Sequence, residues 1–295
     1  MSQPSVSPSE LVSDRPLVPG TLYVVGTPIG NLEDMTFRAV RVLQQADVVA
    51  AEDTRRTGRL LQHFQITTPQ ISYHQHNHRQ RAPELLQRLQ AGQAIALVTD
   101  AGMPGISDPG GALVRACRDA GLPVSPIPGA SAGVTALSAA GLATERFTFE
   151  GFLPSKGRDR QQRLEALKAE SRTAILYEAP HRLQPTLADL TAMLGGERQV
   201  VIARELTKRY EEFWEGSLGA ATERYRERNP QGEFTLLLAG VVAAPLQLSD
   251  DAIRAELQRL LTQGLSHTAA SRQLAQQADL PRRRVYQLAL SLKEE

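Results

Sequence analysis

The 295-residue chain is poor in cysteine, with a single residue of this type, Cys117. One thiol cannot form a disulfide within the chain, and the neighbouring Val114 and Ala116 indicate a buried small side chain rather than a nucleophile. No run of about 18 consecutive apolar residues occurs, so the sequence predicts no membrane-spanning helix and no membrane partner. These absences exclude thiol chemistry and a transmembrane function.

The glycine-rich motifs of common phosphate-binding folds are absent too. The sequence contains neither G-x-G-x-x-G nor a glycine-lysine pair followed by serine or threonine. The formal net charge is only +1, so the overall charge does not indicate a polyanionic partner. Arginines cluster locally at 55–59, 158–163 and 282–284, and these clusters are consistent with either solvated helix faces or RNA contacts.

Short apolar runs alternate with amphipathic stretches, which is typical of an α/β fold. Runs of strand length lie at 21–25, 48–51, 70–73, 94–98 and 124–127, with helical spacing between them, so we expect a mostly parallel first sheet. After residue 141 the last strands follow one another through short connections, which favours a mixed second sheet.

The expected organisation has four parts. Residues 1–19 are rich in Ser and Pro and lack the basic and apolar segments of a signal peptide, so we expect a disordered tail and a cytoplasmic protein. The two α/β domains are expected at 20–129 and 130–243. A helical unit follows at 250–295, after a linker that contains Pro245.

Two loops follow predicted strands and carry glycines and prolines where a helix should begin. One is Gly26-Thr-Pro-Ile-Gly-Asn31, and the other spans 99–111 with the sequence TDAGMPGISDPGG. Open α/β sheets bind ligands at the carboxyl ends of their strands, so both loops are expected to face one cleft. Two tight strand-to-helix turns are the alternative.

The C-terminal unit has the pattern of three short helices. Ser266 is placed to cap the second helix, and Pro281 to lie in the first turn of the third. Arg282, Arg283 and Arg284 then lie at the start of that helix, as in a helix-turn-helix whose last helix contacts nucleic acid. A small helical cap or a dimer contact is the competing interpretation.

Seven further motifs occur along the chain: Leu22-Tyr-Val-Val-Gly-Thr-Pro-Ile-Gly-Asn-Leu32, Ala51-Glu-Asp-Thr-Arg55, Asp100-Ala-Gly-Met-Pro104, Ser107-Asp-Pro-Gly110, Ala139-Ala-Gly-Leu142, Glu150-Gly-Phe-Leu-Pro154 and Ala203-Arg-Glu-Leu-Thr-Lys208. Together these motifs resemble those of the ribosomal RNA small subunit methyltransferase I family, within the tetrapyrrole methylase superfamily. They occur in order from residue 21 to about 240. Met103 stands where the family more often has Thr.

The resemblance implies two α/β domains with S-adenosylmethionine in the cleft between them, a homodimer, and 2′-O-methylation of a cytidine in 16S rRNA at the decoding centre. The small ribosomal subunit or its RNA would be the partner. The residues expected to bind the cofactor are Pro28, Ile29, Asp100, Gly102, Met103, Ile106, Ser131, Ala132, Tyr177 and Ala203.

Asp53 is the candidate general base for the ribose hydroxyl, with Glu52 second, and an Asp53–Arg55 contact that is structural or orients RNA is the competing hypothesis. Lys156, Arg158, Arg204 and Lys208 are candidate phosphate contacts, beside Arg282, Arg283 and Arg284. His74, His76 and His78 alternate, so on an extended strand they would share one face, but we expect no metal there.

Two other functions remain open on the sequence. A corrin or uroporphyrinogen methylase would share the fold and the cofactor but would need a cleft for a flat anionic macrocycle. A ribosome-binding module without catalytic activity would retain the pocket alone. The basic helical tail favours RNA over a macrocycle.

Overall fold

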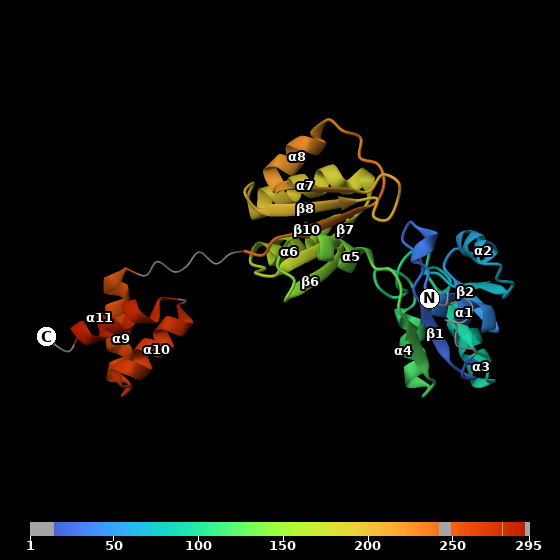
Figure 1. Cartoon of the computed structure of the whole chain (residues 1–295), viewed down its shortest axis with the longest axis horizontal. Coiled ribbons are helices and arrows are strands. Elements are labelled where there is room, and N and C mark those ends of the chain that lie inside the picture. The colour runs from blue at the N-terminus through green and yellow to red at the C-terminus, as the bar shows by residue number, and fades with distance from the viewer. Residues whose placement is uncertain (1–14, 242–248, 279, 293–295) are drawn as a thin grey trace, which may run out of the picture. The chain divides into compact units, whose positions relative to one another are not determined.

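The computed structural model describes residues 15–241, 249–278 and 280–292. The chain forms two compact units, Met1–Gly240 and Val241–Glu295, here called the N-terminal and C-terminal units (Figure 1). Most of the expected disordered tail and the expected linker around Pro245 lie outside the described residues. Residues 15–19 belong to the ordered chain, because Leu17 packs against the first core and the Val18 N–H donates to the Tyr23 hydroxyl at 2.8 Å.

The first sheet of the N-terminal unit has five parallel strands in the order β3-β2-β4-β1-β5. Its strands are β1 (Leu22–Val25), β2 (Val48–Ala51), β3 (Gln70–Ser72), β4 (Ile95–Val98) and β5 (Val124–Ile127). All five carboxyl ends therefore lie along one edge, and β1 and β4 are neighbours.

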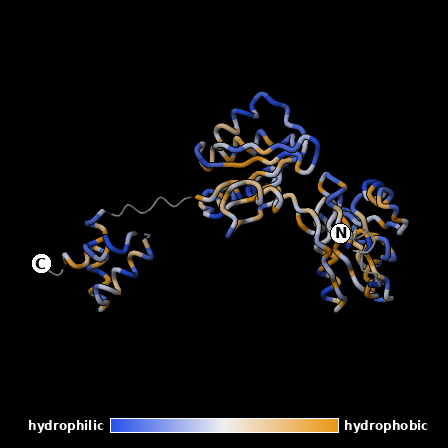
Figure 2. The backbone as a smooth tube through the Cα atoms, in the orientation of Figure 1, coloured by the Kyte–Doolittle hydropathy of each residue, from blue (hydrophilic) through white to orange (hydrophobic). Residues whose placement is uncertain are grey.

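Helices cover both faces of this sheet. They are α1 (Phe37–Gln45), α2 (Thr54–His63), α3 (His78–Gln90) and α4 (Gly111–Asp119), with a short 3₁₀ turn, η2 (Leu32–Asp34), after β1. Leu43 and Leu61 pack on one face with α1 and α2, whereas Leu85 and Leu113 pack on the other with α3 and α4. Hydrophobic residues run along the strands (Figure 2), as expected for a parallel sheet buried on both sides.

The second sheet is mixed, with the order β6-β7-β10-β8-β9. It comprises β6 (Phe147–Phe152), β7 (Thr173–Glu178), β8 (Gln199–Arg204), β9 (Glu212–Ser217) and β10 (Phe234–Leu238). Only β6 and β7 are parallel, and the remaining neighbours are antiparallel. The predicted α/β class, a parallel sheet followed by a mixed one, is confirmed.

Helices α6 (Gly157–Lys168), α7 (Pro180–Leu194) and α8 (Leu218–Arg226) pack on one face of the second sheet. Helix α5 (Ala132–Ala139) packs on the other face. Ile29, from the loop after β1, joins that second core. The first of the two predicted loops therefore packs against the second sheet.

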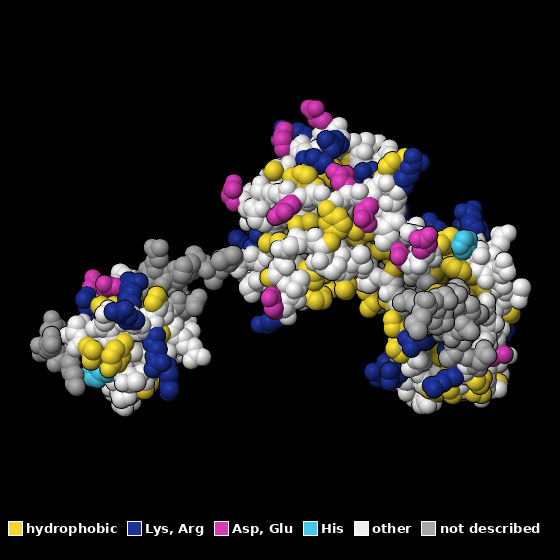
Figure 3. Space-filling model, viewed as in Figure 1, with side chains coloured by type: hydrophobic (Ala, Val, Ile, Leu, Met, Phe, Trp, Pro, Cys, Tyr) yellow, Lys and Arg dark blue, Asp and Glu magenta, His cyan; other side chains and the backbone are white. Residues whose placement is uncertain are grey.

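The C-terminal unit contains α9 (Asp250–Thr262), α10 (His267–Gln277) and α11 (Arg282–Ser291) around its own apolar core. The Ser266 hydroxyl caps α10 by accepting from the Ala269 N–H at 3.2 Å, as predicted. Pro281 precedes α11 instead of lying in its first turn. Lys and Arg side chains gather on the visible face of this unit (Figure 3). None of the helices in the described part of the chain is long and apolar enough to cross a membrane.

Two glycines bring the ends of β1 and β5 into close approach. A Cβ built on Gly129 lies 2.7 Å from the Cα of Gly26, and a Cβ built on Gly26 lies 2.7 Å from the Cα of Gly129. Carbon atoms do not approach backbone this closely without a shift. The carboxyl edge of the first sheet therefore requires glycine at both positions.

We predict that Gly129→Ala lowers the free energy of unfolding of the protein by about 1–3 kcal/mol, because the new methyl group overpacks a backbone contact. Urea unfolding measures the change. Gly111→Ala is the matched control, since a Cβ at Gly111 has no atom within 4 Å. Equal unfolding midpoints for the two variants would contradict this account of the glycine pair.

Candidate functional site

The two predicted loops are hydrogen-bonded to each other at the carboxyl edge of the first sheet. The Thr27 N–H donates to the Gly102 carbonyl at 2.9 Å, and the Gly102 N–H returns a bond to the Thr27 carbonyl at 3.0 Å. The Thr27 hydroxyl also donates to the Thr99 carbonyl at 3.1 Å. Gly102 has a φ of +86°, a conformation that favours glycine. The loops after β1 and β4 therefore form one joined floor.

A pocket of about 520 Å³ lies beside this floor and is lined by loops that follow the strands of the first sheet and by residues of the second sheet. Its volume is in the range typical of small-molecule sites. The walls include eight residues expected from the sequence, namely Ile29, Asp100, Gly102, Met103, Ile106, Ser131, Ala132 and Tyr177. We call this cavity the acidic pocket, because its charged lining is mostly carboxylate, as described below.

Two residues of the predicted set lie elsewhere. Pro28 lines a smaller adjoining pocket of about 320 Å³, together with Asp100. Ala203 is buried in the core beneath α5 and pairs with Thr235 across the sheet. Strand β10 lies between β7 and β8. Its residues Phe234 and Thr235 contribute to the wall of the acidic pocket in place of Ala203.

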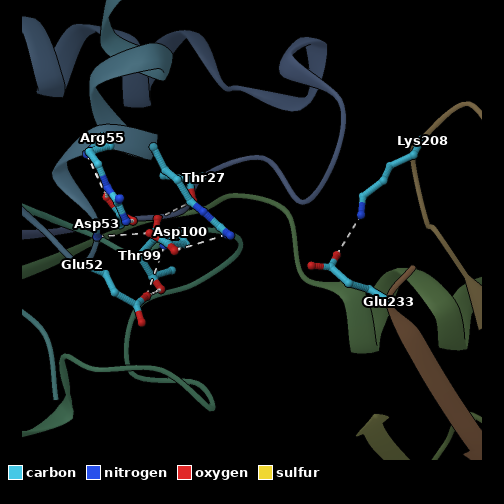
Figure 4. Close-up of polar contacts among 9 residues, drawn as sticks. Thr27, Glu52, Asp53, Arg55, Thr99, Asp100, Lys208 and Glu233 are labelled. Carbon is cyan, nitrogen blue, oxygen red and sulfur yellow. Dashed lines mark hydrogen bonds and ion pairs between the residues drawn. The ribbon is translucent and has the colours of Figure 1, made fainter. Parts of the chain in front are cut away.

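Carboxyl groups gather on the first-sheet side of the acidic pocket. Glu52 accepts the Thr99 hydroxyl at 2.6 Å and the Asp100 N–H at 3.3 Å. Asp100 accepts the Asp53 N–H at 3.1 Å and lies 3.3 Å from the Arg56 guanidinium, as Figure 4 shows in part. Asp100 therefore links the ends of β2 and β4 and does not merely cap its own turn.

Asp108 completes this acidic wall from the end of the second loop. Burial, assisted by the negative charge of Glu52, raises the pKa of Asp108 to about 6. The same two causes raise the pKa of Asp100 above its usual value. Carboxylates crowded in this way stabilise a cation placed between them.

The second sheet contributes an aromatic wall. The Tyr177 hydroxyl accepts the Gly133 N–H at 3.0 Å, which fixes the ring against the start of α5. Phe149 and Phe152 meet the Tyr177 ring edge to face, with centroids 5.1 and 5.7 Å away. Burial raises the pKa of Tyr177, so this side chain stays neutral.

Glu178 and His181 also line the acidic pocket, although the sequence reasoning missed them. The Glu178 carboxylate is 1% exposed, accepts the Thr186 hydroxyl at 2.6 Å and lies 3.4 Å from Arg182. The signal available in the sequence was the polar stretch at the end of β7, followed by Pro180 in the first turn of α7. Asp108, Arg56 and Glu233 were missed as lining residues as well.

Asp53, the candidate general base, and its neighbour Arg55 line neither of these two pockets. Asp53 caps α2 by accepting the Arg55 N–H at 2.9 Å, and the Arg55 guanidinium binds both of its oxygens at 3.1 and 2.8 Å. These hydrogen bonds hold the pKa of Asp53 well below its usual range. A carboxylate so stabilised is a weak proton acceptor, so the geometry favours the competing hypothesis of a structural or RNA-orienting pair.

The four cations predicted in the N-terminal unit differ in their surroundings. Lys208 donates to Glu233 at 2.9 Å (Figure 4). It also donates to Glu205 at 2.8 Å and lines the smaller pocket. Arg204 donates to the Gln231 carbonyl at 2.7 Å and pairs with Glu212. Lys156 and Arg158 are exposed around the start of α6.

In the C-terminal unit, Arg282, Arg283 and Arg284 are all exposed at the start of α11, as predicted. Arg284 is paired with Asp250 at 2.7 Å, so its guanidinium also holds α11 to the start of α9. Arg282 and Arg283 have no ion pair among the described residues.

The three histidines do not share a strand. Strand β3 ends at Ser72, His74 and His76 lie in a turn, and His78 begins α3. The His76 N–H donates to Nδ1 of His74, and Nδ1 of His78 lies 2.8 Å from the Gln75 carbonyl. Among the described residues, no group of three or more His, Cys, Asp or Glu side chains could hold a metal ion.

Comparison with known proteins adds three findings. Residues 21–222 match the family model of the tetrapyrrole (corrin/porphyrin) methylases. Ribosomal RNA small subunit methyltransferase I of Synechocystis sp. is 58% identical, over 93% of this chain and 99% of that protein. The Escherichia coli O157:H7 protein of the same name is 52% identical, over 80% and 83%.

A solved structure shares the fold. Uroporphyrin-III C-methyltransferase from Thermus thermophilus, complexed with S-adenosylhomocysteine, matches with a TM-score of 0.53 and 21% identity. The match covers 74% of this chain and 96% of that one. At this identity the likeness concerns the arrangement of the two sheets.

We predict that the Asp108 carboxyl titrates near pH 6 and that Glu52→Gln shifts its titration to lower pH, because one neighbouring negative charge is removed. Carbon NMR of labelled aspartate carboxyls, assigned with Asp108→Asn, measures both. Titration of Asp108 at the ordinary aspartate pKa in the unsubstituted protein would contradict the buried acidic wall.

Proposed function

The chain belongs to the ribosomal RNA small subunit methyltransferase I family, and on this premise we propose that it methylates the ribose 2′-hydroxyl of a cytidine in 16S rRNA at the decoding centre. The methyl donor is S-adenosylmethionine. The single observation that carries the proposal is the acidic pocket at the joined loops, within a chain that is 58% identical to a named relative over nearly the relative's full length.

The acidic pocket fits the chemistry of this donor. Glu52, Asp100 and Asp108 supply negative charge for a molecule that carries a sulfonium and an ammonium group. Ile29, Met103 and Ile106 supply apolar surface for a purine ring, while the backbone at Gly102 can approach a ligand without interference from a Cβ. S-adenosylmethionine supplies a methyl group already activated on sulfur, so transfer forms a C–O bond, breaks the S–C bond and releases the hydroxyl proton to water.

The protein's main contribution is therefore positioning. Aligning two reactants in a bound geometry lowers a barrier by roughly 7–11 kcal/mol when the alignment is nearly ideal. The Thr27–Gly102 bonds fix the floor of the pocket, and the Tyr177–Gly133 bond fixes its aromatic wall. Glu52, Asp100 and Asp108 would hold the cationic donor in the pocket when it is bound.

We propose that Asp53 and Arg55 orient RNA instead of removing a proton. The Arg55 side chain is 87% exposed and forms an ion pair with Asp53, so its remaining N–H donors face solvent. A guanidinium fixed in this way is suited to bind a phosphate. Lys156, Arg158, Arg282 and Arg283 remain candidates for further phosphate contacts outside the pocket.

Two further expectations belong to this proposal. An enzyme that modifies ribosomal RNA would work in the cytoplasm with the small ribosomal subunit as its partner. We also propose a homodimer, supported by the apolar side chains of Phe147, Phe149 and Val134, which are 42, 40 and 57% exposed on edge strand β6 and on α5. The mass of the protein in solution tests the dimer.

We predict that the protein adds one 2′-O-methyl group to a cytidine of isolated small subunits that lack this modification. Ribose-methylation mapping of the RNA, with and without the protein and donor, measures the product. Subunits that already carry the group serve as the control and should accept no methyl. Transfer to a uroporphyrinogen or corrin in place of RNA would overturn the proposal in favour of a tetrapyrrole methylase.

For Asp53→Asn we predict near-normal single-turnover methyl transfer at saturating RNA, with a higher RNA concentration needed for half-saturation. The reason is that the substitution releases Arg55 without removing a proton acceptor from the pocket. Rapid-quench measurement under saturating donor separates the two effects. A loss of about 10²-fold or more in the chemical step would restore Asp53 as general base.

A further inference from the structure

A second pocket of about 320 Å³ adjoins the acidic pocket. The two cavities share five lining residues, Ile29, Arg56, Asp100, Ala101 and Glu233. We propose that the smaller pocket, here called the basic pocket, is the subsite that receives the ribose-phosphate of the target nucleotide. This inference rests on the proposed function and assigns it a second site.

The two pockets differ in charge. The acidic pocket is lined by five carboxylates, Glu52, Asp100, Asp108, Glu178 and Glu233, and by one arginine, Arg56. The basic pocket is lined by three cations, Arg56, Arg59 and Lys208, and by two of the same carboxylates, Asp100 and Glu233. The acidic pocket therefore favours a cationic donor, and the basic pocket favours an anionic acceptor.

Of the three cations that line the basic pocket, two are paired with carboxylates that also line it, which leaves one arginine for a ligand. Asp100 is paired with Arg56 at 3.3 Å, and Glu233 is paired with Lys208 at 2.9 Å. Arg59 is exposed and has no ion pair within the described residues. It lies one helical turn beyond Arg55, so both guanidiniums project from the same side of α2. A phosphate at the pocket mouth would therefore meet Arg59 first.

The rest of the lining suits a sugar and a base. Leu32, Leu60 and Pro28 form an apolar wall, and Thr27, Thr57 and Thr99 contribute to the lining on the strand side. Because Thr27 and Thr99 are already engaged with backbone and with Glu52, the apolar wall determines the shape of the cavity. Leu32 is 40% exposed, so the pocket is open to a large partner on this side.

Close backbone packing holds the basic pocket together. A Cβ built on Gly30 lies 2.5 Å from the Cγ of Lys208 and 2.8 Å from the hydroxyl oxygen of Thr207. The absent side chain lets the loop after β1 press against the segment after β8. Pro28 and Gly30 of this loop both line the basic pocket and not the acidic one.

Two pairs of variants test the subsite. Arg59→Glu reverses the charge at the pocket mouth, and Arg118→Glu makes the same change on α4, away from either pocket. Leu32→Trp fills the cavity, and Leu32→Ala enlarges it. For each variant, filter binding to a fragment of small-subunit RNA over a salt series gives RNA affinity, calorimetry gives donor affinity, and single-turnover assays give methyl transfer.

We expect Arg59→Glu to weaken RNA binding about tenfold and to reduce the salt dependence by about one released counterion, while Arg118→Glu leaves both near the unsubstituted values. Leu32→Trp should abolish methyl transfer and leave donor affinity within about twofold, which also shows that it folds. Leu32→Ala, which enlarges the cavity without filling it, should lower transfer far less than Leu32→Trp.

Equal RNA affinities for Arg59→Glu and Arg118→Glu, or normal transfer by Leu32→Trp, would overturn the subsite. If the unsubstituted protein transfers no methyl to RNA and yet Arg59→Glu alone weakens RNA binding, the proposed function and the target-nucleotide assignment both fail, and the basic pocket is left as an RNA-binding site. Failure of the subsite and failure of the proposed function are therefore distinguishable.

Discussion

The antiparallel bridge between Thr27 and Gly102 is the constraint on which the rest of the site depends. It joins the loops after β1 and β4, which are neighbouring strands, and the Thr27 hydroxyl adds a bond to the end of β4. With this floor fixed, Asp100 reaches the end of β2, and Ile29 packs into the core of the second sheet. Both pockets lie against this one piece of backbone.

In this arrangement the acidic pocket and the basic pocket carry different charges on the two sides of the wall that they share. Asp100 lines the acidic pocket and the basic pocket at once, as does its partner Arg56, whereas Arg59 and Lys208 line the basic pocket alone. Beside the second sheet, Glu233 precedes β10 and Lys208 follows β8, and the two form a similar pair (Figure 4). A methyl donor and an RNA acceptor carry opposite charges, so such a division brings them together without either competing for the other's site.

Much of the N-terminal unit could be predicted from the sequence, because apolar runs and glycine-rich strand ends are local signals. The joined loops were predicted as facing one cleft, and the structure places Pro28 and Asp100 on one hollow. The alternation of His74, His76 and His78 was a weaker guide, since β3 ends at Ser72 and the chain turns there. A strand period cannot be inferred where the strand has already ended.

Other features depend on contacts that no local pattern records. Strand β10 lies between β7 and β8, so Thr235 pairs with Tyr177 on one side and with Ala203 on the other. This order moves Ala203 away from the pocket and brings Phe234 and Thr235 to it. Likewise, the raised pKa of Asp108 depends on its burial near Glu52, which belongs to a distant part of the chain.

A crystal structure of the protein with S-adenosylhomocysteine would show which pocket holds the donor. We predict that the ligand lies in the acidic pocket, against Met103, Ile106 and Tyr177, with its amino group near the carboxylates and the basic pocket left open. A ligand bound beside Arg59 and Leu32, or one that does not contact the joined loops, would contradict it.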